Sequence, residues 1–373
     1  MKKLIYAISF ILLIISLSTL SYGQGCVAIR PGGVCSLGGG NYNNNGLLQK
    51  GQWQVAATYR YFQSYKHYKG DVEQTERVTN GTQVINISNS IDFNLTYALN
   101  NRLSFSLNLP LISYDRSSLY EHYGNSITAN PNQNRFNTGA KGIGDIRLSA
   151  SYWLFDPEKA MNGNIAIGIG IKAPSGNYNV KDEFHSRLKD GKDSITIRPV
   201  DQSIQLGDGG WGISLEVQAF QKLFNRASLY FNGFYLSNPK NVNSTLTRGT
   251  LQGADPLIAY HSVADQFALR LGINYQPFAS KNLFISLGGR LEGIPSHDLI
   301  GKSEGFRRPG YIISIEPSVM YMQGKTSFVL SVPTALYRNR TKSVYDLADP
   351  KGERHGDAAF ADYLINASII HRF

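Results

Sequence analysis

Residues 84–98, with the sequence VINISNSIDFNLTYA, alternate between apolar and polar side chains with a period of two. Successive side chains of a β-strand leave opposite faces, so this stretch is predicted to be a strand with one apolar and one polar face. A strand of a soluble sandwich usually has about five or six residues, whereas a tilted strand that crosses an outer membrane needs about ten. The length therefore favours a membrane strand.

The same alternation recurs from Gln52 to the end of the chain, and it predicts twelve strands. They are expected at about 52–61, 84–98, 103–111, 144–155, 165–171, 211–222, 227–237, 263–274, 283–292, 311–322, 326–337 and 358–373, the eighth with Val263 outward. Short turns and long polar loops separate these strands in strict alternation, and the long loops are expected at 64–83, 115–141, 174–210, 238–262, 295–309 and 338–357.

This sorting of the loops predicts an all-β fold, an antiparallel up-and-down transmembrane β-barrel with both termini in the periplasm. A closed barrel leaves no strand edge unpaired in lipid. Ten to fourteen strands are compatible with the pattern, because the alternation of residues 227–237 is weak and two of the long loops, 174–210 and 338–357, have room for a hairpin. The barrel domain is expected to span residues 52–373.

The N-terminal residues have a different character. Residues 1–23 combine two lysines, an apolar run and small residues, which predicts a secretory signal peptide cleaved after Gly23. An uncleaved anchor and a lipoprotein acylated at Cys26 are the alternatives. Residues 24–51 are expected to form a short periplasmic segment, in which Cys26 and Cys35, the two cysteines of the chain, are predicted to form a disulfide.

The last predicted strand, 358–373, ends on Phe373. A terminal phenylalanine after alternating apolar residues resembles the signal that outer-membrane barrels present to their insertion machinery. That machinery and the lipid of the outer membrane are therefore the expected partners. His371 departs from the apolar pattern and weakens the signal slightly.

Composition supports a barrel over a bundle of membrane helices. The chain is 42% hydrophobic and 12% aromatic, with 22 tyrosines and a mean hydropathy of −0.23. That is too polar for membrane helices, but it suits strands that place every second residue on lipid and gather tyrosine at the interfaces. The net charge of +10 is scattered along the chain, so nucleic-acid binding is not expected.

The polar faces of the predicted strands carry charges of both signs. The candidate lumen-lining residues are Arg60, Asp92, Asp145, Arg147, Lys172, Glu216, Arg270, Arg290, Glu292 and Glu316. A selective ion pore would line its constriction with one sign of charge. The even balance here favours either an ion-pair network that packs the lumen or a weakly selective channel for uncharged solutes.

The chain shows no signature of catalysis or of cofactor binding. A hydrolytic barrel would need a serine and a histidine on neighbouring strands near one interface, and the predicted strands offer no such pair. The predicted outer loops contain one histidine each: His67, His122, His185, His261, His297 and His355. No pair of them has the spacing of metal ligands, so neither a metal site nor an enzyme is expected.

Two glycine-rich tracts carry a further pattern: residues 142–148 read GIGDIRL, and residues 168–176 read GIGIKAPSG. They resemble an outer-membrane barrel family associated with the meta-cleavage pathway of phenol degradation, in which a G-x-G-D-[IL]-x-[LV] strand is followed by one ending in K-x-P-[ST]-G. Residues 207–211, GDGGW, also fit, and the similarity covers about 143–236. The resemblance implies a channel for small, often aromatic compounds.

The sequence therefore predicts an outer-membrane barrel of a Gram-negative bacterium that lets small molecules, aromatic or hydrophobic ones among them, pass by passive or facilitated diffusion. A plugged barrel that serves as a surface structural or interaction protein is the alternative. The residues do not identify the solute.

Overall fold

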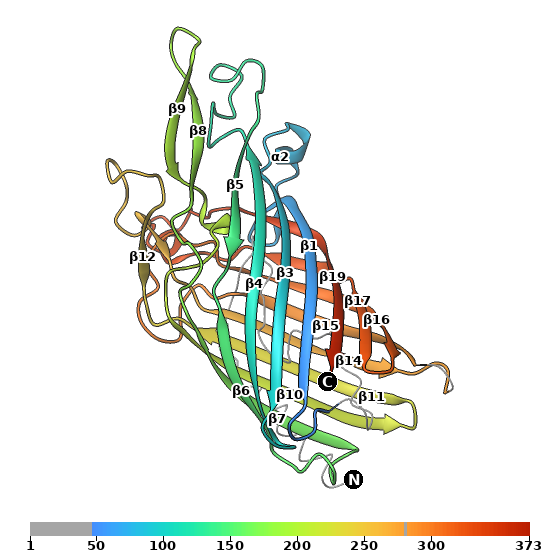
Figure 1. Ribbon diagram of the computed structural model, residues 1–373. Helices are drawn as coiled ribbons and strands as arrows, with labels where there is room; N and C mark the ends of the chain where they lie inside the picture. The colour runs from blue at the N-terminus through green and yellow to red at the C-terminus, as the bar shows by residue number, and fades with distance from the viewer. Residues whose placement is uncertain (1–46, 280–281) are drawn as a thin grey trace.

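The computed structural model of the protein describes residues 47–279 and 282–373. Within them, twelve antiparallel barrel strands form one closed β-barrel, which confirms the predicted fold (Figure 1). Closure comes from the first and last strands, which pair from Gln54 opposite Arg372 to Tyr68 opposite Ala358. This pairing satisfies the backbone of strands that lipid could not hydrate.

Ten of the barrel strands are continuous and two are interrupted. In chain order they are β1 (Trp53–Lys69), β3 (Ile85–Ala98), β4 (Leu103–Ser118), β5 (Phe136–Ile143) with β6 (Arg147–Trp153), β7 (Gly163–Lys172), β10 (Gly212–Phe224), β11 (Ala227–Ser237), β14 (Gln266–Tyr275), β15 (Leu283–Ile294), β16 (Gly310–Gln323), β17 (Thr326–Ser331) with β18 (Thr334–Asn339), and β19 (Ala358–Arg372). The weakly alternating residues 227–237 are thus a full barrel strand.

The two interruptions have different causes. β17 and β18 are separated by Val332 and Pro333, and proline has no backbone N–H to donate to a neighbouring strand. β5 and β6 both pair with β4 but are separated by residues 144–146. The predicted strand 144–155 contains β6, but the barrel strand begins earlier than predicted. Its long-loop half is β5, most of which lies within the predicted loop 115–141.

Exposure alternates along the barrel strands in the sense expected of a membrane barrel. In β3 the polar side chains Asp92 and Asn94 are 4% and 2% exposed, whereas Ile91 and Phe93 are 38% and 39% exposed. Apolar side chains therefore cover the outside of the barrel and polar ones fill its interior. Among the described residues, no helix is long and apolar enough to cross a membrane.

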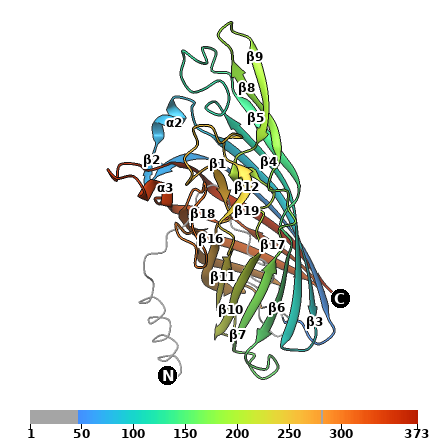
Figure 2. The ribbon, with the colours of Figure 1, turned by 90° about the vertical axis from the view of Figure 1, so that its left-hand side faces the viewer.

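Long loops gather at one end of the barrel and short turns at the other (Figures 1 and 2). The long loops contain β2 (Val72–Glu73), α2 (Thr75–Thr79), β8 (Lys181–Arg187), β9 (Asp193–Pro199), η2 (Gln202–Ile204), β12 (Val242–Leu246), β13 (Tyr260–Ser262) and α3 (Val344–Leu347). Figure 1 shows the β8–β9 hairpin extending beyond the rim, and it forms a sheet of its own, so it adds no strand to the barrel.

Two predicted placements in this region were wrong. His67, predicted in a loop, lies in β1, which continues to Lys69 because it pairs with β19 as far as Tyr68. Val263, predicted to face lipid, precedes β14 and is fully buried. In both cases contacts with distant segments decide where the strand ends.

Tyr230 of β11 packs across the inner wall over two glycines of the next strands. Gly272 lies opposite both Tyr230 and Gly288 in the strand register. A Cβ atom at Gly288 would overlap the Tyr230 hydroxyl and would lie 2.7 Å from the Leu271 carbonyl oxygen. The tyrosine can therefore occupy this position only because both neighbours lack side chains.

We expect Gly288→Ala to lower the free energy of unfolding by about 1–3 kcal/mol, because the added methyl group overpacks this contact. Gly289→Ala is the matched control, since a Cβ at Gly289 meets nothing within 4 Å. Guanidinium unfolding in lipid vesicles measures both variants. Equal stabilities of the two variants would contradict the packing described for Tyr230.

Candidate functional site

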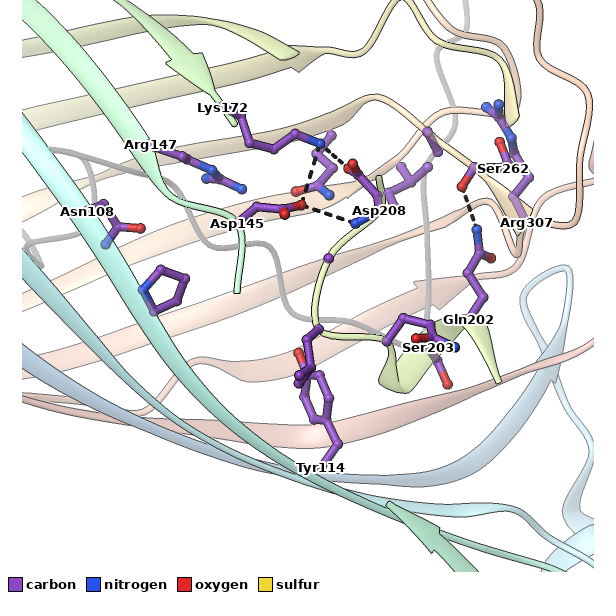
Figure 3. Close-up of a pocket in the computed structure, with 17 residues that line it drawn as sticks. Asn108, Tyr114, Asp145, Arg147, Lys172, Gln202, Ser203, Asp208, Ser262 and Arg307 are labelled. Atoms are coloured by element: carbon purple, nitrogen blue, oxygen red, sulfur yellow. Dashed lines mark hydrogen bonds and ion pairs between the residues drawn. The ribbon is translucent and has the colours of Figure 1, made fainter. Parts of the chain in front are cut away.

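A cavity lies inside the long-loop half of the barrel (Figure 3). It encloses about 900 Å³, open solvent included, and its walls come from β4, β6, β7, β14 and β15. Residues 202–208 of the third long loop form another side of it. Its lining mixes apolar surface with charged side chains, which are those of Asp145, Arg147, Lys172, Asp208 and Arg307. A cavity in the lumen with a mixed lining and several converging charged groups is the strongest candidate for a functional site.

The third long loop folds inward to reach this cavity. Val200, Ile204 and Leu206 are buried, and they pack against Ile112 and Tyr114 on the inner face of β4. This apolar contact stabilises the loop inside the barrel, where it narrows the lumen. We call residues 200–208 the inner segment.

The Ser175 side chain forms hydrogen bonds with the backbone of residues 144–146, where the strand is interrupted between β5 and β6. Its hydroxyl accepts a hydrogen bond from Ile146 N at 2.8 Å and donates one to the Gly144 carbonyl at 3.1 Å. The glycine is needed because a Cβ there would lie 2.6 Å from Ile112 Cδ1. The serine side chain thus supplies the hydrogen-bond partners of Ile146 N and the Gly144 carbonyl, while Gly144 N and the Ile146 carbonyl still pair with Pro110 and Ala173 on the neighbouring chain segments.

Asp145 lies in the same interruption and holds the loop in place. Its carboxylate accepts hydrogen bonds from Gly176 N at 2.9 Å and from Asp208 N at 3.1 Å. Lys172 forms an ion pair with Asp208, and its Nζ lies 3.9 Å from Asp145 Oδ2 (Figure 3). We call Asp145, Lys172, Ser175 and Asp208 the staple, because together they fix both ends of the inward-folded loop to the barrel wall.

The glycine-rich tracts identified in the sequence therefore meet at one place in the structure. Asp145 comes from GIGDIRL, Lys172 and Ser175 come from GIGIKAPSG, and Asp208 comes from GDGGW. The three tracts therefore supply the side chains that hold the inner segment against the barrel wall.

Asp201 fixes the other end of the inner segment to the remaining loops. Its carboxylate accepts two hydrogen bonds from the Arg308 guanidinium, at 2.8 and 2.7 Å, and lies 3.5 Å from Arg116 Nη2. Burial alone would raise the pKa of Asp201, but the Arg116 and Arg308 guanidinium groups hold it well below its usual range. The carboxylate is therefore charged at any physiological pH.

Two loop histidines are buried in their neutral form. His122 stacks on Phe184 with a centroid distance of 5.3 Å, and its Nδ1 accepts a hydrogen bond from His185 N. His261 is 1% exposed, and neither of its ring nitrogens has a hydrogen-bond partner. Burial lowers the pKa of each histidine from 6.5 to about 4. Both imidazoles are therefore uncharged at neutral pH.

The ten charged residues proposed from the sequence lie at several places. Arg270 forms a two-point contact with Glu316, at 2.8 and 2.5 Å, while Arg290 pairs with Glu292 at 2.7 Å and lies 4.0 Å from Glu316. Asp145 and Lys172 belong to the staple. The other four belong to neither group. Arg60 donates to Asn366, Arg147 lies over the Phe234 ring and opposite Lys172 in the register, Glu216 accepts from Ser214, and Asp92 is buried on β3.

Other residues of the site were not predicted. Asp201 and Arg308 come from loops without periodicity, and Arg116 lies at the end of β4 that was predicted as part of the loop 115–141. No pattern in the sequence indicates that the three meet. The predicted disulfide of Cys26 and Cys35 and the predicted signal peptide lie outside the described residues. Within residues 47–279 and 282–373, no group of three histidine, cysteine, aspartate or glutamate side chains could hold a metal ion.

Comparisons with known proteins were made by sequence and by structure. No protein-family model and no curated protein matches the chain. The fold is similar to the crystal structure of an outer membrane channel from Pseudomonas putida F1, with a TM-score of 0.56 and 16% identity over 90% of this chain and 98% of that one.

Two further structures are less similar. One is the P. putida toluene transporter TodX, with a TM-score of 0.41 and 10% sequence identity over 95% of this chain and 99% of that one. The other is a Pseudomonas aeruginosa FadL homologue, with a TM-score of 0.40 and 8% sequence identity over 94% of this chain and 99% of that one. At 16% identity the first comparison shows the fold alone, which is that of an outer-membrane β-barrel.

We expect Asp145→Ala to release the inward-folded loop, because it leaves the Gly176 and Asp208 amides without their acceptor, at a cost of about 1–3 kcal/mol for each buried group. Protease added to the folded protein in lipid should cleave within residues 174–210 several-fold faster than in the wild type. Mass spectrometry of the fragments measures the rate and the position.

Asp115→Ala is the control for this variant, since Asp115 alternates outward on β4 and should leave cleavage unchanged. Cleavage of Asp145→Ala at the wild-type rate would contradict the role given to the staple.

The buried histidines predict that the loops lose stability in acid. Above pH 6.5 the two imidazoles are neutral in both the folded and the unfolded loops. As the pH falls from 6.5 towards 4, the imidazoles of the unfolded loops become protonated, while those of the folded loops stay neutral. Stability should therefore fall in this window, by up to about 3 kcal/mol per histidine at about 1.4 kcal/mol per pKa unit. Thermal unfolding midpoints measured across pH 4–7 test this.

The double variant His122→Phe, His261→Leu should show a smaller decrease, and His297→Gln, which alters an exposed side chain, should behave as the wild type does. A decrease of the same size in the double variant would assign the acid sensitivity to other groups.

Proposed function

We propose that this protein is an outer-membrane channel through which small molecules diffuse passively down their gradients. The observation that carries the proposal is the cavity of about 900 Å³, open solvent included, which is bounded by the barrel wall on one side and the inner segment on the other. An inward-folded loop that leaves a polar passage restricts the size of a solute without closing the barrel. The long-loop end would face the cell exterior.

The charges of the lumen support weak ion selectivity. Arg270 and Arg290 are compensated by Glu316 and Glu292, and Lys172 is compensated by Asp208. A solute therefore meets hydrogen-bonding groups and few uncompensated charges. The resemblance in sequence points to aromatic or hydrophobic solutes. The mixed lining of the cavity suits solutes that combine an apolar body with hydrogen-bonding groups.

A plugged barrel that presents its loops as an interaction surface is the second candidate. The β8–β9 hairpin supports it, because the hairpin extends beyond the rim and exposes Ile195 and Ile197 by 52% and 60%. In that case the inner segment would close the lumen and the hairpin would be the functional part.

Osmotic swelling of proteoliposomes distinguishes the two functions. An open channel predicts swelling in glycerol and pentoses at rates well above those of empty vesicles, falling steeply towards disaccharides. Heat-modifiable gel mobility establishes that the protein is folded. Folded protein that gives no swelling with any of these solutes would favour the plugged barrel.

A further inference from the structure

A second pocket lies where four of the long loops meet, at the Asp201 end of the inner segment. It encloses about 340 Å³, open solvent included. Its charged lining consists of three arginines and two carboxylates, which are those of Arg198, Arg248, Arg308, Glu121 and Asp201. All five residues lie outside the barrel strands, and Arg248 is exposed. A ligand can therefore reach this pocket from solvent at the long-loop end.

The two carboxylates of the pocket already have partners of opposite charge. Glu121 accepts hydrogen bonds from Nε and Nη2 of Arg116, at 2.8 and 3.2 Å. Asp201 accepts its two hydrogen bonds from Arg308, at 2.8 and 2.7 Å. Two arginines thus compensate two carboxylates, and the other two arginines of the pocket add two positive charges to its lining.

Arg198 is held in a fixed position by contacts that leave its charge uncompensated. Its guanidinium carbon lies 3.8 Å from the centroid of the Phe184 ring, and its Nη2 donates to the Glu121 carbonyl oxygen at 2.9 Å. Within the described part of the chain it has no ion pair, and its other side-chain N–H groups are neither hydrogen-bonded nor closed off from solvent. These N–H groups can therefore donate to a ligand in the pocket.

The close approach of two loops places Arg248 next to Arg198. Gly249 has a φ of +73°, and a Cβ atom there would lie 2.9 Å from Arg198 Cβ, so only glycine allows this approach. Arg248 forms no hydrogen bond or ion pair with any described residue. Burial lowers the pKa of Arg198; the Glu121 carboxylate opposes this shift, and repulsion from Arg248 adds to it.

Two like charges brought together in this way are unfavourable for the fold alone, whereas a bound anion would stabilise them. A guanidinium group presents its donors as a planar fork that matches the oxygens of an oxyanion, and charge-assisted hydrogen bonds of this kind are about twice as strong as neutral ones. The pocket is therefore suited to an anionic ligand.

We propose that Arg198 and Arg248 form a binding site for a divalent oxyanion, a phosphate or sulfate group, at the long-loop end of the barrel. Two neighbouring guanidinium groups match two negative charges better than the single charge of a carboxylate. The bound anion would bridge the loops 174–210 and 238–262. A phosphate group can come from free phosphate or from the headgroup of lipopolysaccharide. The site goes beyond the proposed channel function, because it does not require an open lumen.

Isothermal titration calorimetry of the folded protein in non-ionic detergent tests the site, with inorganic phosphate at pH 8 as the probe and acetate at equal ionic strength for comparison. We expect saturable binding of one phosphate per chain, at least tenfold tighter than that of acetate. Arg248→Gln should weaken phosphate binding at least tenfold. Heat-modifiable gel mobility establishes that the variant is folded, as expected for a change at an exposed side chain.

Arg187→Gln is the matched control, because Arg187 is an exposed arginine of the same β8–β9 hairpin and does not line the pocket. It removes the same charge and should bind phosphate as the wild type does. An equal loss in both variants would assign the binding to general attraction by the basic loops and overturn the inference. Phosphate binding that is absent, non-saturable, unchanged in Arg248→Gln or no tighter than that of acetate would also overturn it.

Competition with lipopolysaccharide distinguishes the two sources of the phosphate group. Lipopolysaccharide that displaces phosphate from the wild type, and binds Arg248→Gln at least tenfold more weakly, would identify the lipid headgroup as the ligand. Phosphate binding that lipopolysaccharide does not disturb would identify a free oxyanion. Lipopolysaccharide that binds the wild type and Arg248→Gln equally, with no binding of phosphate to either, would overturn the inference.

Discussion

The arrangement of the barrel interior depends on the hydrogen bonds that the Asp145 carboxylate accepts from backbone amides. This carboxylate lies where the wall is interrupted, and it binds two backbone amides that are far apart in sequence, those of Gly176 and Asp208. A loop inside a barrel must satisfy its own polar backbone groups, and a charged acceptor does so more strongly than a neutral one. The interruption of β5 and β6 is therefore the means by which the loop is held inside.

The ion pairs of the lumen and the loops follow from the same constraint. Burying a charge is costly unless it is paired and hydrogen-bonded, and Asp201, Arg308 and Glu316 each have partners at close range. Removing one side chain of such a pair would leave the charge of the other buried without a counter-charge. The interior thus contains separate clusters of paired charges, and the inner segment narrows the lumen between them.

The alternation of residues predicted the barrel, its closure and its twelve strands, because a period of two directly reports which face meets lipid. The same reasoning placed Asp145 on a continuous strand and did not find Asp201, since loops have no period and their contacts depend on the fold. The glycine-rich tracts were recognisable in the sequence, but only the structure brings Asp145, Ser175 and Asp208 together.

Single-channel recording of the mature protein in a planar bilayer tests the central claim, an open polar passage narrowed by a stapled loop, most directly. The account predicts small, stable, ohmic steps with a reversal potential near zero in a salt gradient, because the charges of the lumen are compensated. It also predicts larger steps once the staple is removed. A folded wild-type protein that conducts no current, with or without the staple, would contradict the claim and favour a closed barrel.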